Sequence, residues 1–303
     1  SKTDLPWDAE KIRNMCPVDQ YTGGIEHATM HLLYFRFFTK ALADMGLLDF
    51  REPAKRLFNQ GMILGEDHEK MSKSRGNVVN PDDLVQKYGT DTVRAYLMFL
   101  GPWDAGAPWN PHGIEGLARF FKGVWTLCQM ENTETVTVKT EIEKQLRKTL
   151  HQTIKKAGED LQHFRFNTAI AAVMAFRNVL KTEAGAAGSD VWKECLEGML
   201  LMLAPIAPHI TEELWEKIKP GCGSIHQQAW PEYDESLIVE DMVTLVVQVN
   251  GKVRDRLEML AGTSKEEAEQ SALAAPKVQS YLEGKQIQKV IVVPGRLVNI
   301  VSD

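Results

Sequence analysis

The stretch that decides the fold runs from Gly61 to Pro81 and reads GMILGEDHEKMSKSRGNVVNP. It opens with a short apolar run, which predicts a strand. Asn80 and Pro81 predict the start of a helix, because asparagine caps helix N-termini and proline suits the first helical position. Between the strand and the helix lies a polar loop centred on Lys70 and Lys73. The stretch therefore predicts a cationic loop held between two regular elements.

The loop itself can hold an anion. Lys70 and Lys73 flank Met71 and Ser72, so two ammonium groups can meet one ligand. Lysine is a compact point charge that suits phosphate, and the hydroxyls of Ser72 and Ser74 add donors. Such a loop can clamp a polyphosphate and neutralise charge that develops in a transition state. A solvated surface turn explains the same composition, because acidic residues at positions 66, 67 and 69 cancel the local charge.

The composition indicates a globular protein with more than one domain. Of its 303 residues, 44% are hydrophobic and 25% are charged, which suggests a proper core and two or three domains. The net charge of −6 does not indicate a nucleic-acid protein, although binding needs only a local basic face. No apolar run is long enough for a membrane span. The four cysteines are widely spaced, which makes a zinc site or disulfide framework unexpected and a reducing cytoplasm the expected location.

Residues 1–60 and 61–115 are the first two of four regions along the chain. In residues 1–60 we expect a strand, a turn at residues 23–24 and a long helix, because apolar residues recur at helical spacing after the glycine pair. This order is typical of half of a nucleotide-type α/β unit. In residues 61–115 two helices follow the lysine loop, with Gly89 ending the first helix and Thr90 capping the second.

Residues 116–235 carry helical apolar spacing throughout. Several such segments separated by Gly, Ser, Asn and Thr predict an antiparallel helical bundle. Asn167 and Thr211 are the expected N-caps of two of its helices.

Residues 240–303 combine strand-like and helical patterns and predict a small α+β domain. Asn250 and Gly251 form the strongest two-residue hairpin signal in the chain. Ser264 and Glu267 predict a capping box at the start of a helix.

The string Lys-Met-Ser-Lys-Ser, after an apolar strand and before Gly-Asn-x-x-x-Pro, resembles the signature loop of class I aminoacyl-tRNA synthetases. The resemblance implies that the loop closes over ATP, bound as its Mg²⁺ complex. It also implies that Lys70 and Lys73 stabilise the pyrophosphate leaving group, with Lys73 the stronger candidate. Met71, Ser72 and Ser74 are then expected to be ATP-binding residues.

The segment PVDQYTGGIEHATMHLLYFRF, residues 17–37, resembles the adenosine-binding strand, turn and helix of leucyl-tRNA synthetases. Gly23 and Gly24 can let the backbone approach ribose and adenine closely. Glu26 can accept hydrogen bonds from ribose hydroxyls, and His27 lies beside it. The alternatives are an ordinary turn for the glycines, a charge at the positive end of a helix for Glu26, and a packed or solvated ring for His27.

Three later segments, LAPIAPHITEELW, VVQVNGKVR and KVIVVPGRLVNIV, resemble the bundle and the C-terminal domain of bacterial leucyl-tRNA synthetases. The expected fold is mainly α with α/β parts. Residues 1–60 would form the C-terminal half of a Rossmann-type catalytic domain, and residues 61–115 the lysine loop and a stem-contact region. Residues 116–235 would form a tRNA-binding bundle of the anticodon-binding type, and residues 240–303 a tRNA-binding α+β domain.

No His-x-Gly-His string occurs in the sequence, although this motif supplies the other half of the class I nucleotide site. By resemblance, the leucine pocket, the editing domain and a zinc module would also lie upstream. We therefore expect the C-terminal part of a leucyl-tRNA synthetase, with no metal site and no zinc of its own.

Basic side chains point to RNA as a partner. Residues 139–183 hold nine basic and five acidic side chains, a local charge of +4 in a chain of −6. A basic bundle face can follow a phosphate backbone, and a mixed-charge solvated helix face is an equal alternative. The candidate tRNA-binding residues are Lys148, Lys155, Lys156, Lys252, Arg254, Arg256, Lys289 and Arg296.

The leading hypothesis is an enzyme fragment. The whole enzyme would form leucyl-adenylate and pyrophosphate from leucine and ATP, and would transfer leucine to leucine tRNA. The fragment alone would be inactive and would meet leucine through the missing N-terminal part. The alternative is a tRNA-binding module without catalysis, or the small subunit of a split synthetase. An unrelated nucleotidyl transferase with a similar loop does not explain the other matching segments. Neither hypothesis includes a membrane partner.

Overall fold

The computed structural model describes residues 7–130, 136–238, 242–260 and 263–303. The chain divides into two compact units, Ser1–Tyr233 and Asp234–Asp303. We call them unit 1 and unit 2. None of the helices in these described ranges combines the length and the apolar character that crossing a membrane requires.

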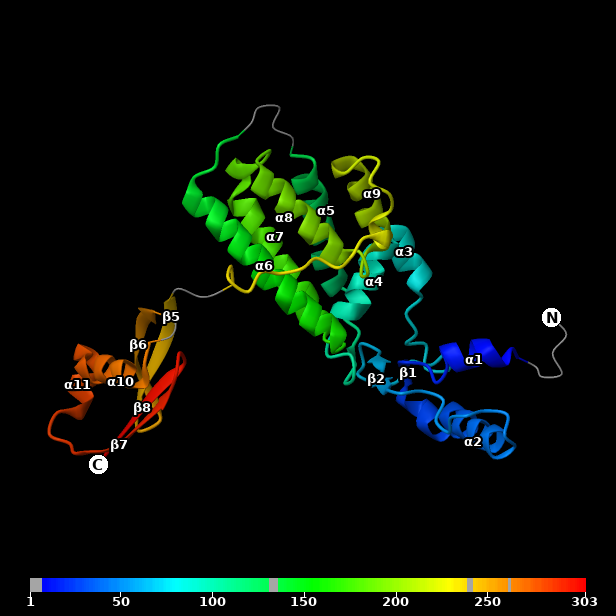
Figure 1. Cartoon of the computed structure of the whole chain (residues 1–303), viewed down its shortest axis with the longest axis horizontal. Helices are drawn as coiled ribbons and strands as arrows, with labels where there is room; N and C mark the ends of the chain where they lie inside the picture. The colour runs from blue at the N-terminus through cyan, green and yellow to red at the C-terminus, as the bar shows by residue number, and fades with distance from the viewer. Residues whose placement is uncertain (1–6, 131–135, 239–241, 261–262) are drawn as a thin grey trace. The chain divides into compact units, whose positions relative to one another are not determined.

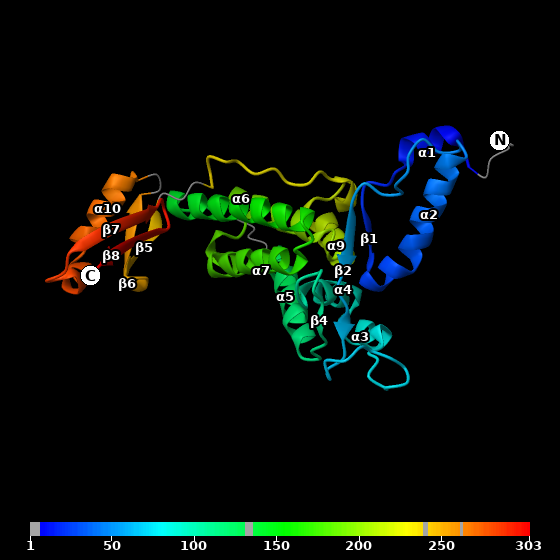
Figure 2. The same cartoon turned by 90° about the horizontal axis from the view of Figure 1, so that it is seen from below.

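Unit 1 begins with two small parallel sheets (Figures 1 and 2). Strand β1 (Tyr21–Gly24) pairs with β2 (Leu57–Gln60), and β3 (Ile63–Leu64) pairs with β4 (Ala107–Pro108). Parallel neighbours need a crossover connection, which a 3₁₀ helix, η1 (Ile25–Thr29), and helix α2 (His31–Asp44) supply between β1 and β2. Helix α1 (Ala9–Met15) precedes β1.

The glycine pair that was expected to form a turn lies inside β1, so that prediction is wrong. Gly24 has extended backbone angles, φ −64° and ψ 147°, and both glycines have register partners in β2. The chain turns only afterwards, in η1. The long helix that was predicted to follow the pair is confirmed as α2.

Helix α2 exposes its apolar face. The rings and side chains of Met30, Leu33, Tyr34, Phe37 and Phe38 are between 56% and 67% exposed. Thr39 is the buried residue of this helix. Parallel sheets and apolar helix faces are ordinarily covered on both sides. Within the described residues, this face of α2 has no such cover, which bears on the function proposed below.

Helices α3 (Pro81–Tyr88) and α4 (Thr90–Phe99) follow the lysine loop. Asn80 caps α3, because its Oδ1 accepts a hydrogen bond from the N–H of Asp82 at 3.2 Å. Gly89 is both the C-cap of α3 and the N-cap of α4, with a left-handed φ of 84°. The prediction that Thr90 caps α4 is therefore wrong. A single glycine redirects the chain, and Thr90 is already the first helical residue.

Five longer helices form the bundle (Figure 1). They are α5 (Gly113–Cys128), α6 (Thr140–Gln162), α7 (Phe166–Thr182), α8 (Asp190–Leu203) and α9 (Pro208–Ile218). Their core is continuous with the apolar face of α4. Large side chains such as Trp192, Phe176 and Met199 are fully buried in it.

Two N-cap predictions in the bundle are wrong. Helix α7 begins at Phe166 with Arg165 at the cap, so Asn167 is inside the helix. Helix α9 begins at Pro208, because proline suits the first helical position. Thr211 is buried within α9, and its hydroxyl donates to the carbonyl of Ala207 at 2.8 Å.

Polar side chains fix α4 on the bundle. The carboxylate of Asp91 meets His209 Nδ1 at 2.7 Å and accepts the N–H of Ile210 at 2.6 Å, in the first turn of α9. Arg94 Nε donates to the carbonyl of Ile206 at 3.2 Å, between α8 and α9. These bonds satisfy backbone groups that helix ends otherwise leave free. The first part of unit 1 is thereby held on the bundle at defined points.

Two further 3₁₀ segments, η2 (Ala184–Ala186) and η3 (Ile225–Gln227), flank the last bundle helices. After η3 the chain returns along α6. Trp230 Nε1 lies 3.1 Å from the position that a Cβ on Gly158 would take. The ammonium of Lys155 lies 5.2 Å from the centre of the Tyr233 ring.

Unit 2 is a four-stranded sheet with two helices on one face. The strands β5 (Met242–Val249), β6 (Lys252–Leu260), β7 (Ile287–Val293) and β8 (Leu297–Ser302) have the order β6-β5-β8-β7. Helices α10 (Lys265–Ala274) and α11 (Pro276–Leu282) pack on the face that carries Leu245 and Val247.

Two local predictions for unit 2 are confirmed. Asn250 and Gly251 have φ angles of 52° and 75° in the turn between β5 and β6, as a tight hairpin turn requires. Ser264 and Glu267 form the capping box of α10.

Candidate functional site

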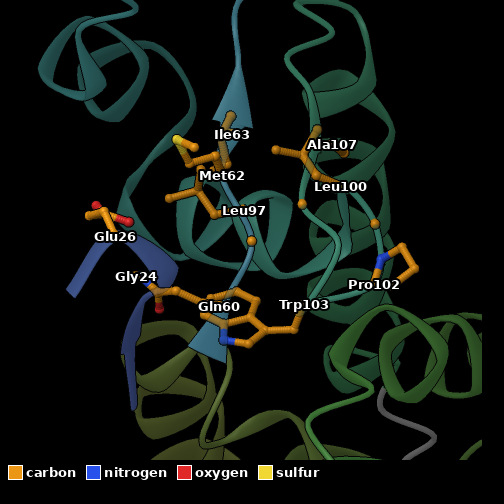
Figure 3. Close-up of a pocket in the computed structure, with 13 residues that line it drawn as sticks. Gly24, Glu26, Gln60, Met62, Ile63, Leu97, Leu100, Pro102, Trp103 and Ala107 are labelled. Atoms are coloured by element: carbon orange, nitrogen blue, oxygen red, sulfur yellow. The ribbon is translucent and has the colours of Figure 1, made fainter. Parts of the chain in front are cut away.

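A cavity of about 280 Å³ lies in unit 1 between the two small sheets and the end of α4 (Figure 3). Gly24 ends β1 and Gln60 ends β2, so the cavity lies at the carboxyl ends of these parallel strands. Open parallel sheets bind their ligands at such ends. The cavity is lined by Gly24, Glu26, Gln60, Gly61, Met62, Ile63, Leu97, Leu100, Gly101, Pro102, Trp103, Gly106 and Ala107.

The back of the cavity is made by two backbones in direct contact. A Cβ on Gly106 would lie 2.1 Å from the carbonyl oxygen of Met62, and a Cβ on Gly61 would lie 2.2 Å from the nitrogen of Gly106. Gly61 also donates its N–H to the carbonyl of Trp103 at 2.8 Å. Gly106 has a φ of 70°, which glycine adopts without strain. Only glycine fits at both positions, so the two backbones touch and close the back of the cavity, whose other walls are mainly apolar.

Glu26 lies at the edge of the cavity beside Gly24 (Figure 3). A Cβ on Gly24 would lie 2.4 Å from Glu26 Oε2, so glycine at position 24 leaves the room that the carboxylate occupies. Among the described residues, the Glu26 carboxylate has neither a hydrogen-bond nor an ion-pair partner. Its oxygens are therefore available as acceptors for a ligand.

The structure separates the other members of the glycine segment from the cavity. Gly23 lies in β1 and does not line it. His27 packs edge-on against His31, with ring centres 6.1 Å apart, and its Nδ1 is buried without a hydrogen-bond partner. Of the four nucleotide-binding candidates in this segment, the structure brings Gly24 and Glu26 to the cavity and places Gly23 and His27 beside it.

The lysine loop is tied at its base by Asp67 and Asn77. Asn77 Oδ1 accepts the N–H of Ser72 at 2.9 Å, and Asn77 Nδ2 donates to Asp67 Oδ2 at 3.0 Å. The backbone N–H of Glu69 donates to Asp67 Oδ1 at 3.1 Å. The bond from Glu69, and next the one from Asn77, lower the pKa of Asp67 below its ordinary value even though partial burial opposes this. The carboxylate therefore stays ionised and holds the loop together.

Met71 anchors the middle of the loop by packing against the core of unit 1. Lys70 and Lys73, on either side, are exposed. In the described part of the chain neither ammonium group forms an ion pair, whereas Arg75 pairs with Glu69 at 3.1 Å. The loop follows directly from β3, whose Ile63 lines the cavity. The two lysines, like Met71, Ser72 and Ser74, do not line the cavity themselves.

Sequence reasoning missed most of the cavity wall. The apolar side comes from the end of α4 and the segment after it, including Leu97, Leu100, Pro102 and Trp103. This segment, GPWDAGAP, predicts only a loop from its Gly and Pro content. The signal that was available is the pair Gly101 and Gly106, since glycines outside a tight turn mark close backbone approach.

The candidate RNA-binding residues of unit 1 differ in their contacts within the protein and in their exposure. Lys156 forms an ion pair with the buried Asp160. Lys155 lies over the Tyr233 ring. Lys148 is half-buried on α6. Two of the three are therefore engaged within the protein.

The candidates in unit 2 gather mainly on the sheet face that lacks helices. Arg256 pairs in register with Val246, whose neighbours Leu245 and Val247 face the core on the other side. Lys289 precedes the inward-facing Val290 and is likewise on the open face. Arg296 helps to line a hollow of about 450 Å³ on this face. Lys252 is exposed at the start of β6, and Arg254 stacks on the Tyr281 ring at 4.0 Å.

Two family models match the chain. Residues 1–105 match "tRNA synthetases class I (I, L, M and V)". Residues 143–269 match "Anticodon-binding domain of tRNA ligase". The first match contains the lysine loop and the residues that line the cavity, except Gly106 and Ala107. The second contains most of the bundle.

Curated relatives match nearly the whole chain. A leucine–tRNA ligase of Dehalococcoides mccartyi (strain 195) is 54% identical over 298 residues, and one of Rubrobacter xylanophilus is 51% identical over 296 residues. The chain is a homologue of leucine–tRNA ligases. Each match covers 98% of this chain and 36% of the relative. The chain thus spans little more than a third of the length of these relatives and corresponds to their C-terminal region.

Solved structures agree on the fold. A LeuRS of Agrobacterium radiobacter K84, solved as a ternary complex with tRNA and LeuAMS, superposes with a TM-score of 0.83 at 34% identity. The superposition covers 98% of this chain and 40% of that one. Methionyl-tRNA synthetase of Mycobacterium tuberculosis, bound by methionyl-adenylate, superposes with a TM-score of 0.54 at 17% identity over 68% of this chain and 45% of that chain. The class I synthetase fold predicted from the sequence is thereby confirmed, with its helical bundle and its small sheets.

The contact at Gly106 gives a direct test of how the cavity is built. Gly106→Ala places a Cβ against the Met62 backbone and adds left-handed strain, so we expect a loss of about 3 kcal/mol in the free energy of unfolding. Gly221→Ala is the matched control, because Gly221 has a φ of 77° but nothing within 4 Å of its Cβ position. It should lose only about 1 kcal/mol. Denaturant unfolding measures both, and equal losses would contradict the close contact.

Proposed function

We propose that the chain supplies the nucleotide cavity and the pyrophosphate clamp of a leucine–tRNA ligase. Together with the rest of such an enzyme it would convert leucine and ATP, bound as its Mg²⁺ complex, to leucyl-adenylate and pyrophosphate. The leucyl group would then pass to leucine tRNA. The observation that carries the proposal is the continuity of the cavity with the lysine loop through β3, in a homologue of these ligases.

The cavity suits the adenosine part of ATP. The cavity in front of the Gly61–Gly106 contact has mainly apolar walls, as a flat purine ring requires. Met62 and Ile63 border it, and their backbone groups can form hydrogen bonds with the ring edge. The N–H of Gly61 is already donated to Trp103. The unpartnered Glu26 carboxylate at the rim can accept the ribose hydroxyls. Gly24 contributes by leaving room for that carboxylate.

The lysine loop suits the phosphates. Lys70 and Lys73 present two exposed ammonium groups, without an ion pair among the described residues, on the segment that follows β3. Met71 and the Asp67–Asn77 bonds hold the base of the loop, so the lysines can approach a ligand without unfolding it. Charge that moves onto the departing pyrophosphate would be stabilised electrostatically. Ser72 and Ser74 add hydroxyl donors nearby, which already contact each other at 3.2 Å.

The exposed face of α2 suits the rest of the catalytic domain. Leu33, Tyr34 and Phe37 form an apolar surface beside a two-stranded parallel sheet, and such sheets are covered in complete α/β domains. The relatives are almost three times as long as this chain. We therefore expect the isolated chain to be inactive in leucine activation. A cytoplasmic location fits this role and the four free cysteines.

RNA binding is the second function that we propose. Residues 139–183 carry a local charge of +4, and the structural relative from Agrobacterium was solved with tRNA. In unit 2, Arg296 helps to line a mainly apolar hollow on the open sheet face. Arg256 pairs in register with Val246 of this lining, and Lys289 lies farther along the same face. An apolar hollow with a cationic rim suits bases and phosphates together. Leucine tRNA is the proposed ligand.

Lys73→Ala tests the clamp in a complete ligase that contains this chain. The variant loses one positive charge that would stabilise the developing pyrophosphate. The kcat of leucine-dependent pyrophosphate exchange should therefore fall by about 100-fold. Lys193→Ala is the control, because Lys193 is an exposed lysine on α8 paired with Asp190. It should leave kcat unchanged. A loss below threefold for Lys73→Ala would contradict the clamp.

The RNA surface is tested by removing two charges from the open sheet face. Arg256→Gln with Lys289→Gln should weaken the binding of leucine tRNA and reduce the salt dependence by about 0.7–0.9 per lost phosphate contact. Lys265→Gln with Lys277→Gln removes the same charge from the helices on the other face. Gel shifts at several salt concentrations measure both pairs. Equal effects of the two pairs would show that this face has no special role.

A further inference from the structure

One wall of the cavity packs against the bundle. Trp103 lines the cavity (Figure 3) and lies in the loop after α4. Its ring meets the ring of Phe166 edge-on, with centres 5.0 Å apart and planes at 86°. The indole Nε1 is buried and has no hydrogen-bond partner in the described structure. The orientation of this ring therefore depends on packing, and Phe166 supplies an aromatic contact to it.

A second wall of the cavity packs against the same end of the bundle. Phe58 lies in β2, two residues before Gln60, which lines the cavity. The Phe58 ring stacks on Phe164, with centres 4.3 Å apart and planes at 12°. Phe164 and Phe166 are themselves 5.6 Å apart. Phe164 lies in the turn between α6 and α7, and Phe166 is the first residue of α7. This end of the bundle reaches β2 (Figure 1).

This turn is built to hold a fixed shape. Phe164 has a φ of 58°, which is unusual for a bulky residue and persists only where the surroundings enforce it. The enforcing residue is Asp160, which is fully buried. Its carboxylate pairs with Lys156 and with Arg165, whose Nε lies 2.7 Å away, and its carbonyl accepts the N–H of Arg165 at 2.8 Å.

The carboxylate of Asp160 is stabilised in its charged form. Burial raises its pKa, but hydrogen bonds from Lys156, Thr168 and Arg165 outweigh this and lower the pKa below the ordinary value. The carboxylate is therefore ionised at neutral pH and clamps both ends of the turn. A rigid turn that carries two rings toward the cavity differs from an ordinary surface loop, which is mobile and polar.

We propose that Phe164 and Phe166 are positioning residues for the nucleotide. They do not line the cavity, but they set where Trp103 and the end of β2 lie, and so set the shape of the cavity. The inference rests on the proposed nucleotide function of the cavity. It assigns to the bundle a role in nucleotide binding that is separate from any contact with RNA.

The kinetic test uses Phe166→Leu in a complete ligase that contains this chain. Leucine keeps the site apolar but removes the ring that meets Trp103, so the KM for ATP should rise about tenfold, the size of one aromatic pair. The kcat of pyrophosphate exchange should change less than threefold, because no group near the phosphates is altered. Phe166→Tyr keeps the ring and should restore the KM.

Phe176→Leu is the matched control, because Phe176 is also on α7 but lies in the bundle core at 1% exposure. It makes the same chemical change and should leave the KM for ATP within twofold. An unchanged KM for Phe166→Leu, or an equal rise in the control, would overturn the proposal.

A second readout does not depend on catalysis. In the 303-residue chain labelled with 5-fluorotryptophan, the ¹⁹F signal of Trp103 is assigned by its loss in Trp103→Phe. Phe166→Leu should shift or broaden this signal and leave that of Trp192, in the bundle core, in place. Phe176→Leu should not move the Trp103 signal. An unmoved Trp103 signal in Phe166→Leu would overturn the positioning role, whatever the ligase activity. Inactivity of every ligase variant would instead count against the proposed function.

Discussion

The chain's site depends on one backbone contact, the approach of Gly61 and Met62 to Ala105 and Gly106. This contact joins the strand before the lysine loop to the segment after α4, and it shapes the back of the cavity. The parallel pairing of β3 with β4 continues it. Side chains at either glycine would drive the two backbones apart. The cavity and the base of the lysine loop therefore depend on the same contact.

That contact is itself fixed to the bundle. Asp91 and Arg94 on α4 bind backbone groups at the ends of α8 and α9, and the aromatic rings of the α6–α7 turn hold Trp103 and Phe58 from the other side. The bundle thus holds the elements that frame the cavity at two separated places. In contrast, α2 carries its apolar residues outward. Unit 1 is packed against the bundle on one side and exposes apolar side chains of α2 on another.

Local sequence signals predicted the regular elements well, because caps and turns are short-range chemistry. Asn80, the Asn250–Gly251 turn and the Ser264 capping box are confirmed. The same reasoning was wrong at Gly23–Gly24, where pairing with β2 keeps the glycines extended. It could not find the cavity wall, because Leu97, Pro102 and Trp103 become neighbours of Gly24 only through the fold. It also could not show that Lys156 pairs with a buried acid on the same helix.

The central claim is that this chain holds the clamp and the nucleotide cavity but needs the remainder of a ligase to use them. Leucine-dependent exchange of pyrophosphate into ATP measures this directly, with the chain alone and after addition of the separately produced remainder of a relative. The account predicts no exchange by the chain alone and clear exchange after mixing, as the exposed face of α2 becomes covered. Strong exchange by the chain alone would contradict it.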